Sequence, residues 1–170
     1  ITNAELAASL TVSVEKWNAD HAVDIAAGTV GARELPDETF IEKASGIASR
    51  YVMEKSGVLD PDRMRPILPL RSEDELGVQA EMSMPAILDA LVQAGRRSSD
   101  VDAVIVGCSN LQRAYPAVAI EVQNALGAGG WAFDMNVACS AATFGLQAGI
   151  DAIRSGSANC VVVVNPEITS

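Results

Sequence analysis

The sequence has few basic residues. Lys and Arg together number 12, against 22 Asp and Glu among 170 residues, which gives a formal net charge of -10 at pH 7. A nucleic-acid interface needs clustered positive charge to neutralise phosphates, and the sequence contains no basic stripe. We therefore predict no nucleic-acid partner.

Histidine and cysteine are also scarce. His21 is the one histidine, and Cys108, Cys139 and Cys160 lack the close spacing of metal ligands. We predict neither a metal site, nor a cofactor, nor a disulfide framework. Because no signal peptide is recognisable, three thiols favour a reduced, cytoplasmic protein.

Long apolar runs are missing, although 49% of the residues are hydrophobic and the mean hydropathy is +0.20. No run approaches the roughly 20 residues that span a bilayer, so we predict no membrane partner. The excess of apolar residues instead indicates an apolar surface that a missing partner surface would cover. The length suffices for one domain with a full core.

Residues 131–145 carry the strongest chemical signal. The first seven alternate in the manner of a strand, and a helix is predicted to begin directly after it at Cys139, with small side chains at helical spacing over 140–153. Gly156 is suited to the left-handed position after a helix. A helix with side chains this apolar and this small is expected to be buried and closely packed.

Cys139 lies at this junction, as the first residue of the predicted helix. Unpaired N–H groups and the positive end of the helix dipole favour a thiolate there, and a thiolate is a nucleophile. The alternative is a buried structural cysteine, since free cysteine is among the most buried residue types. Cys160, in an apolar run typical of a strand covered on both faces, and Cys108, at a strand exit, are interpreted as core residues.

The first part of the chain is irregular. Residues 2–6 begin like a capped helix, with Asn3 as the N-cap. Segment 17–39 is polar and acidic and predicts helical turns within a surface insertion. Segment 57–70 contains three prolines and predicts an irregular surface loop.

The second part is regular. Ser72 and Glu75 form a capping box that predicts the start of a helix running to Ala94. The elements predicted after it are strand 102–107, helix 117–126, strand 131–137, helix 140–153 and strand 159–164. This alternation predicts an α/β fold with a mostly parallel sheet.

Segment 101–166 closely resembles the N-terminal half of β-ketoacyl-acyl carrier protein synthase III, a condensing enzyme of the thiolase-like fold. The matching pieces are strand 103–106, the loop ending Ala114-Tyr115-Pro116, the helix with Gln123 and Leu126-Gly127, the segment from Phe133 to Cys139, and Arg154-Ser155-Gly156. Upstream, residues 2–6 and 40–47 are similar in character. The resemblance implies a mostly parallel sheet between helical layers, with a buried nucleophile helix.

The resemblance also implies a reaction of fatty acid synthesis. Cys139 would accept an acyl group from acyl-coenzyme A and then condense it with malonyl-acyl carrier protein as carbon dioxide leaves. The product would be a 3-ketoacyl-acyl carrier protein two carbons longer. The backbone N–H of Cys139 would help to bind the oxyanion.

Partners and substrate contacts follow from the same resemblance. Acyl-CoA and acyl carrier protein are the implied substrates, and a homodimer is implied in which Tyr115 reaches the partner's acyl pocket. Phe40 and Ala44 replace a tryptophan and an arginine that contact coenzyme A in short-chain members, so that clamp is weakened or rebuilt. Phe40, Tyr115 and Phe144 are the expected substrate contacts.

Several features of the family would lie outside the sequence. The first strand would precede Ile1, and the histidine and asparagine that stabilise the enolate would follow Ser170; nothing around His21 matches that motif. We therefore expect a fragment that needs its own missing C-terminal half and is inactive alone. Segment 17–39 is either a solvated insertion or a lid that shapes a pocket for medium-length acyl chains.

Two alternatives stay open for the function. A thiolase or a hydroxymethylglutaryl-CoA synthase shares the acyl-cysteine step without the decarboxylation, and a non-catalytic subunit would keep only the fold. A surface charge of -10 should repel the acidic carrier protein unless a basic patch exists. Arg63, Arg65 and Arg71 would add to such a patch.

Overall fold

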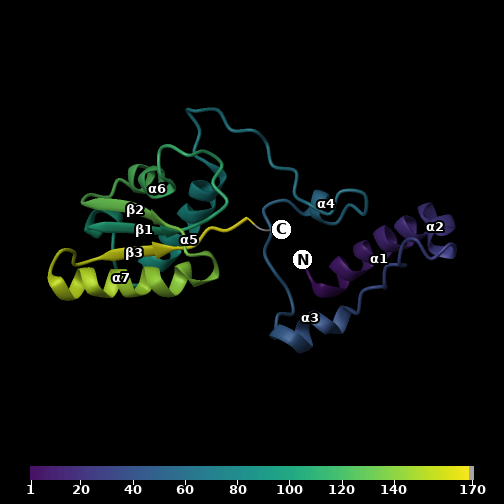
Figure 1. The fold of residues 1–170 in the computed structure, drawn as a ribbon. Helices are drawn as coiled ribbons and strands as arrows, with labels where there is room; N and C mark the ends of the chain where they lie inside the picture. The colour runs from purple at the N-terminus through teal and green to yellow at the C-terminus, as the bar shows by residue number, and fades with distance from the viewer. Residues whose placement is uncertain (169–170) are drawn as a thin grey trace. The chain divides into compact units, whose positions relative to one another are not determined.

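The computed structural model describes residues 1–168, which fall into two compact units divided between Pro69 and Leu70 (Figure 1). The division coincides with the end of the predicted loop 57–70. The assignment of both units to one half-domain stays a prediction. No helix among the described residues is long and apolar enough to cross a membrane.

The first unit contains helices α1 (Asn3–Asp20), α2 (Ala22–Ala26), α3 (Glu38–Ser45) and α4 (Lys55–Val58). Thr2 is the N-cap of α1, because its hydroxyl accepts from the N–H of Glu5 (3.2 Å) while the Glu5 carboxylate accepts from the N–H of Thr2 (2.8 Å). The predicted cap, Asn3, was wrong by one residue. Asn3 is buried, and its amide instead donates to the carbonyl of Ile47 (2.6 Å).

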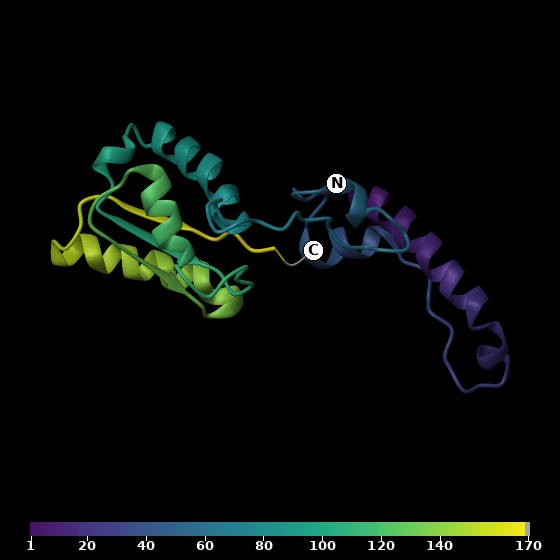
Figure 2. The ribbon, with the colours of Figure 1, turned by 90° about the horizontal axis from the view of Figure 1, so that it is seen from above.

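The predicted excursion 17–39 returns along α1 as a loop after α2 (Figure 2). The side chain of Asn18 donates to the carbonyl of Arg33 and accepts from its N–H, both at 2.9 Å. The Arg33 guanidinium lies 4.0 Å from the centre of the Trp17 ring, which also stacks on His21. None of the described side chains of this excursion is buried. The lid interpretation stays a prediction.

The second unit contains helices α5 (Val78–Gln93), α6 (Val118–Leu126) and α7 (Ala141–Ser155) and strands β1 (Ala103–Gly107), β2 (Trp131–Met135) and β3 (Val161–Val164). Short 3-10 turns, η1 (Ser98–Asp100) and η2 (Ala138–Ser140), precede β1 and α7. The strands form a parallel sheet in the order β2-β1-β3. The predicted parallel α/β sheet is confirmed.

Helices cover both faces of this sheet (Figure 1). Along β1, Val104 and Val106 pack into the cluster that α5 and α6 contribute to, while Ile105 faces α7. All three side chains are fully buried. The alternation follows from the period of two along a strand, and it makes β1 the centre of the core.

The start of α5 differs from the prediction. Ser72 and Glu75 do form the capping hydrogen bonds, yet these close a turn and the helix begins three residues after Glu75. The first N–H groups of α5 are satisfied from elsewhere, because Gly77 donates to Glu121 (2.6 Å) and the next residue donates to Gln112 (2.9 Å). Tertiary partners, not the local box, set where this helix starts.

Helix α7 packs closely on the sheet, as predicted. A Cβ added at Gly145 would lie 2.9 Å from Val163, and one at Gly149 would lie 3.3 Å from Val161. The prediction that the whole helix is buried was wrong, since only its sheet-facing side is covered. Four large apolar side chains of the helix are between 44% and 59% exposed, namely Phe144, Leu146, Ile150 and Ile153.

Candidate active site

Cys139 lies in the 3-10 turn η2, between the end of β2 and the start of α7. The prediction that it is the first residue of the helix was therefore wrong by two positions. The physical reason is Ala138, whose φ of 48° is left-handed and interrupts the path into a regular helix. The N–H of Ser140 accordingly donates to the carbonyl of Val137 (3.1 Å), and regular helix begins at Ala141.

The turn is strained. A left-handed conformation costs a non-glycine residue on the order of 1–2 kcal/mol, so the surrounding structure must hold Ala138 in place. Strained turns of this kind cluster at functional sites. Nothing in the sequence around Ala138 signals this conformation.

The three cysteines differ in exposure. Cys139 is exposed, whereas Cys108 is 1% exposed and packs in the core of the second unit. Burial, and to a lesser extent the nearby carboxylates of Asp134 and Glu167, together raise the pKa of the Cys108 thiol to about 12. The interpretation of Cys108 as a core residue is confirmed, and its thiol is held protonated near neutral pH.

Cys160 corrects one expectation. It precedes β3 and is partly buried, and β3 is an edge strand whose residues are all only partly buried. The predicted strand covered on both faces was therefore wrong for the described chain. Among the described residues, no group of His, Cys, Asp and Glu is arranged to hold a metal ion.

The strand that leads to Cys139 is fixed by Asp134. Its two carboxylate oxygens accept from the N–H groups of Val118 (2.8 Å) and Ala119 (2.7 Å), the first two residues of α6. A carboxylate at a helix N-terminus satisfies unpaired donors and complements the dipole. Sequence reasoning missed this role, and the available signal was a single acidic residue inside an apolar strand.

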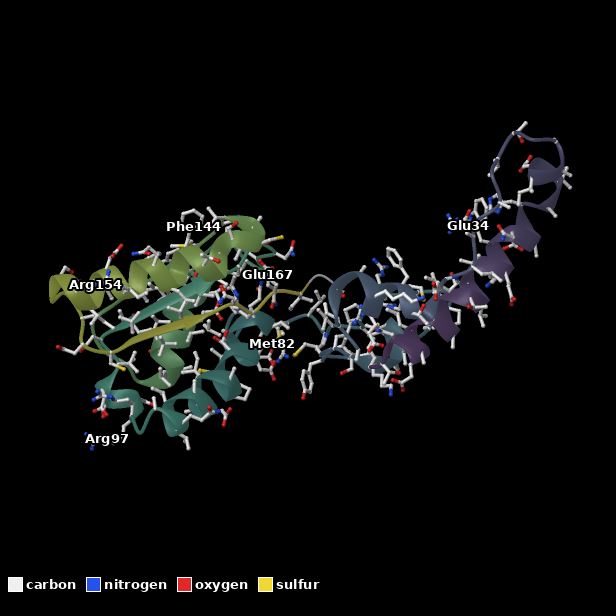
Figure 3. All side chains as sticks on the ribbon, turned by 90° about the horizontal axis from the view of Figure 1, so that it is seen from below. Glu34, Met82, Arg97, Phe144, Arg154 and Glu167 are labelled. Atoms are coloured by element: carbon white, nitrogen blue, oxygen red, sulfur yellow. The ribbon has the colours of Figure 1, made fainter. Side chains whose placement is uncertain are left out.

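The carboxyl ends of the three strands carry further polar side chains. Ser109, after β1, donates through its hydroxyl to Glu167 (2.7 Å), and Asn110 donates to the other oxygen of the same carboxylate (3.4 Å). Glu167 lies on the segment that leaves β3 (Figure 3). Parallel α/β sheets bind ligands at this edge, and Cys139 follows the end of β2 there. Sequence reasoning missed the contact of Ser109 with Glu167.

The predicted substrate contacts are all exposed. Phe144 lies on the outer side of α7, five residues after Cys139, and is 54% exposed (Figure 3). Tyr115 precedes α6 and is 87% exposed, and Phe40 lies in α3 of the first unit and is 65% exposed. The structure thus places Phe144 on the same helix that begins after Cys139. The substrate roles of all three stay predictions.

Comparison with known proteins agrees with the geometry. Residues 133–170 match the family model of 3-oxoacyl-[acyl-carrier-protein (ACP)] synthase III. The β-ketodecanoyl-[acyl-carrier-protein] synthase of Pseudomonas aeruginosa is 55% identical over 160 residues, which cover 94% of this chain and 46% of that protein. The chain belongs to the synthase III family. It spans less than half the length of this relative.

Solved structures extend this result to the fold. The 3-oxoacyl-[acyl-carrier-protein] synthase III of Aquifex aeolicus matches 61% of this chain and 32% of its own with a TM-score of 0.51 and 31% identity. A variant of OleA from Xanthomonas campestris matches 97% of this chain and 40% of its own with a TM-score of 0.59. At 16% identity the second match shows the fold alone. The predicted thiolase-like α/β fold and the family resemblance are confirmed.

Proposed function

We propose that this chain carries the acyl-accepting cysteine of a β-ketoacyl-acyl carrier protein synthase III. One observation carries the proposal. Cys139 is an exposed thiol in a strained strand-to-helix turn, and it lies inside the segment that matches the synthase III family. The same segment contains the glycine-packed helix that fixes the turn on the sheet.

The first step is acyl transfer. Cys139 loses its proton, and its sulfur attacks the thioester carbonyl carbon of acyl-coenzyme A. The bond from that carbon to the coenzyme A sulfur breaks, and coenzyme A leaves as a thiolate that takes up a proton. Backbone N–H groups of a turn before a helix are suited to bind the transient oxyanion, because they are fixed donors.

The second step forms the carbon–carbon bond. Malonyl-acyl carrier protein loses carbon dioxide, and the electron pair of the broken bond is left on the carbon next to the thioester. That carbon attacks the acyl carbonyl, and the bond to the Cys139 sulfur breaks to restore the thiolate. Two substitution steps replace one difficult step, which is the general advantage of covalent catalysis. No resident cofactor takes part.

We infer a medium-chain acyl donor. The relative from Pseudomonas aeruginosa is named for a β-ketodecanoyl product, which has ten carbons. Malonyl contributes two of these, so the donor of such a reaction is an eight-carbon acyl group. In this proposal, segment 17–39 and the exposed side chains of Phe40, Tyr115 and Phe144 shape the acyl and coenzyme A sites.

The proposal includes an assembly. Acyl-CoA and acyl carrier protein are the substrates, the active form is a homodimer, and a C-terminal half supplies the groups that stabilise the enolate. The three unpaired cysteines favour the reducing cytoplasm. The exposed outer side of α7 supports a covering partner, since exposed apolar patches of this kind mark interaction surfaces.

Mass spectrometry of the acylated protein tests the proposal. The full-length protein is incubated with acetyl-, butyryl-, octanoyl- or decanoyl-CoA, and the adduct is located by peptide mapping. We expect one acyl group on Cys139, most rapidly from octanoyl-CoA. The Cys139→Ala variant should take up none, while Cys108→Ala, the matched control, should behave as wild type. A folded, dimeric protein without any adduct would overturn acyl-CoA priming.

A further inference from the structure

Three elements of the second unit meet at Gly107, the last residue of β1. A Cβ added at Gly107 would overlap the side-chain oxygen of Asn165 and would lie 2.9 Å from the Cβ of Ala141. Asn165 is the first residue after β3, and Ala141 is the first residue of α7. The space that a side chain would fill at Gly107 is therefore occupied by the carboxamide of Asn165 and the methyl group of Ala141.

This contact involves a residue that is close in sequence to Cys139, the candidate nucleophile. Ala141 is buried and follows Cys139 by two residues. Cys139 lies in the strained 3-10 turn η2, which is closed by the bonds from the N–H of Ser140 to Val137 and from the N–H of Ala141 to Ala138. A group that fixes Ala141 against the end of β1 therefore also limits where the Cys139 thiol can lie.

The segment that carries Asn165 is itself tied down. Two residues after Asn165, the carboxylate of Glu167 accepts from the hydroxyl of Ser109 (2.7 Å) and from the amide of Asn110 (3.4 Å). On the other side of β1, the N–H of Cys108 donates to the carbonyl of Met135, which extends the ladder with β2 (3.2 Å). The exit of β1 is thus bound to the exits of both neighbouring strands.

We propose that Asn165 is a positioning residue for Cys139, held in place by Glu167. Its short, planar carboxamide fills the space above Gly107 and braces the start of α7, so that the strained turn presents the thiol in one orientation. This inference rests on the proposed function, because the orientation matters only if Cys139 reacts. A misplacement of about 1 Å at a reacting group lowers a rate by about 100-fold.

Kinetics of the acylation half-reaction test this role. In the full-length protein, Asn165→Ala removes the brace while leaving the exposed thiol intact. We expect kcat for acylation of Cys139 to fall about 10- to 100-fold, with KM for the acyl-CoA unchanged, since Asn165 is assigned no substrate contact. Asn124→Ala, which truncates an exposed asparagine on α6, is the matched control and should keep both constants.

A second pair of variants guards against a simple folding defect. Glu167→Ala removes both hydrogen bonds to the β1 exit and should lower kcat in the same way. Glu167→Gln keeps the shape and one acceptor oxygen for Ser109, so it should restore most of the rate. If Glu167→Gln is as slow as Glu167→Ala although both are folded, the bracing by Glu167 is overturned.

A measurement without acyl-CoA separates this inference from the proposed function. The rate at which iodoacetamide alkylates Cys139 is compared in wild type, Asn165→Ala and Asn124→Ala, with the site located by peptide mapping. We expect only Asn165→Ala to react more slowly than wild type. If wild-type Cys139 accepts no acyl group, the proposed function fails while this series still reports on the brace. Unchanged alkylation in folded Asn165→Ala, or an unchanged kcat, would overturn the inference.

Discussion

The two units bury different kinds of residues. In the second unit, residues 103–106 of β1 are all 0% exposed and apolar, whereas the 18-residue helix α1 of the first unit buries only Asn3, Ser9 and Val14. Two of those three side chains are polar. The second unit therefore has an apolar core of its own, and the first unit depends mainly on specific polar contacts.

The contacts of the first unit join α1 to the segment 47–67. They are the bonds from Asn3 to Ile47, from Arg50 to Asn3, from Ser9 to Leu59 and from Lys55 to Glu5. A net hydrogen bond contributes about 1 kcal/mol, and exposed ion pairs contribute less. The unit that carries Cys139 should thus be the more stable one, and the first unit should respond more to pH.

The largest effect is expected from the core of the second unit. Ile105→Ala removes a fully buried side chain between β1 and α7 and should lower the free energy of unfolding by about 2–5 kcal/mol. Urea denaturation of the full-length protein measures the loss, and hydrogen exchange of the β1 peptide locates it. Val23→Ala, at an 83% exposed position of α2, should change it by less than about 0.5 kcal/mol. Equal effects of the two variants would contradict the comparison.

A smaller effect is expected at Asp134. Asp134→Ala leaves the first N–H groups of α6 without their acceptor and should cost about 1–2 kcal/mol. Asp134→Asn retains one oxygen and should lose less. Urea denaturation gives the free energies, and hydrogen exchange should increase first in the α6 peptide. An unchanged α6 peptide in Asp134→Ala would show that packing alone holds the helix.

Much of the second unit could be predicted because its signals are local. The predicted strand 102–107 and helix 117–126 differ from β1 and α6 by one residue at their starts and agree at their ends. Gly127 and Gly156 take the left-handed conformation that ends a helix, with φ of 68° and 78°. A glycine stop and an apolar period depend on a few neighbouring residues, so a single sequence carries them.

The errors arise where distant residues decide the local structure. The N–H of Gly77, the N-cap residue of α5, donates to Glu121, which is 44 residues away in the sequence. The hydroxyl of Ser109 donates to Glu167, which is 58 residues away. The left-handed Ala138 is imposed by its surroundings, since alanine has no intrinsic preference for that conformation. Cys139 could be selected from the sequence as the nucleophile candidate, but its turn and its brace at Asn165 could not.

The next largest effect is expected from acid, which should destabilise the first unit more than the second. Hydrogen bonds from Ser56, then from Ile67 and Gly57, lower the pKa of Glu54 from 4.5 to about 2. A carboxylate with a lowered folded pKa stabilises the fold above the unfolded value, and this contribution is lost as the pH falls from 4.5 towards 2. We expect the peptide 54–67 to lose protection from hydrogen exchange in this range, relative to β1, after correction for intrinsic rates.

Two variants make the acid prediction specific. Glu54→Gln should weaken protection of the peptide 54–67 already at pH 7 and remove most of its dependence on acid. Glu15→Gln changes an exposed carboxyl on α1 and should leave the acid response unchanged. If Glu54→Gln responds to acid as wild type does, another carboxyl controls this segment.

The smallest effect concerns the excursion 17–39. Stacking of an exposed Arg33 guanidinium on Trp17 contributes about 0.5–1 kcal/mol, so Arg33→Ala should speed hydrogen exchange of peptide 27–37 by about two- to fivefold. Arg33→Ala keeps the backbone bonded to Asn18, and Asn18→Ala removes that pair while keeping the stack. If only Asn18→Ala accelerates exchange, the amide pair alone closes the loop. If both do, the excursion is held by two independent polar contacts, consistent with the rest of the first unit.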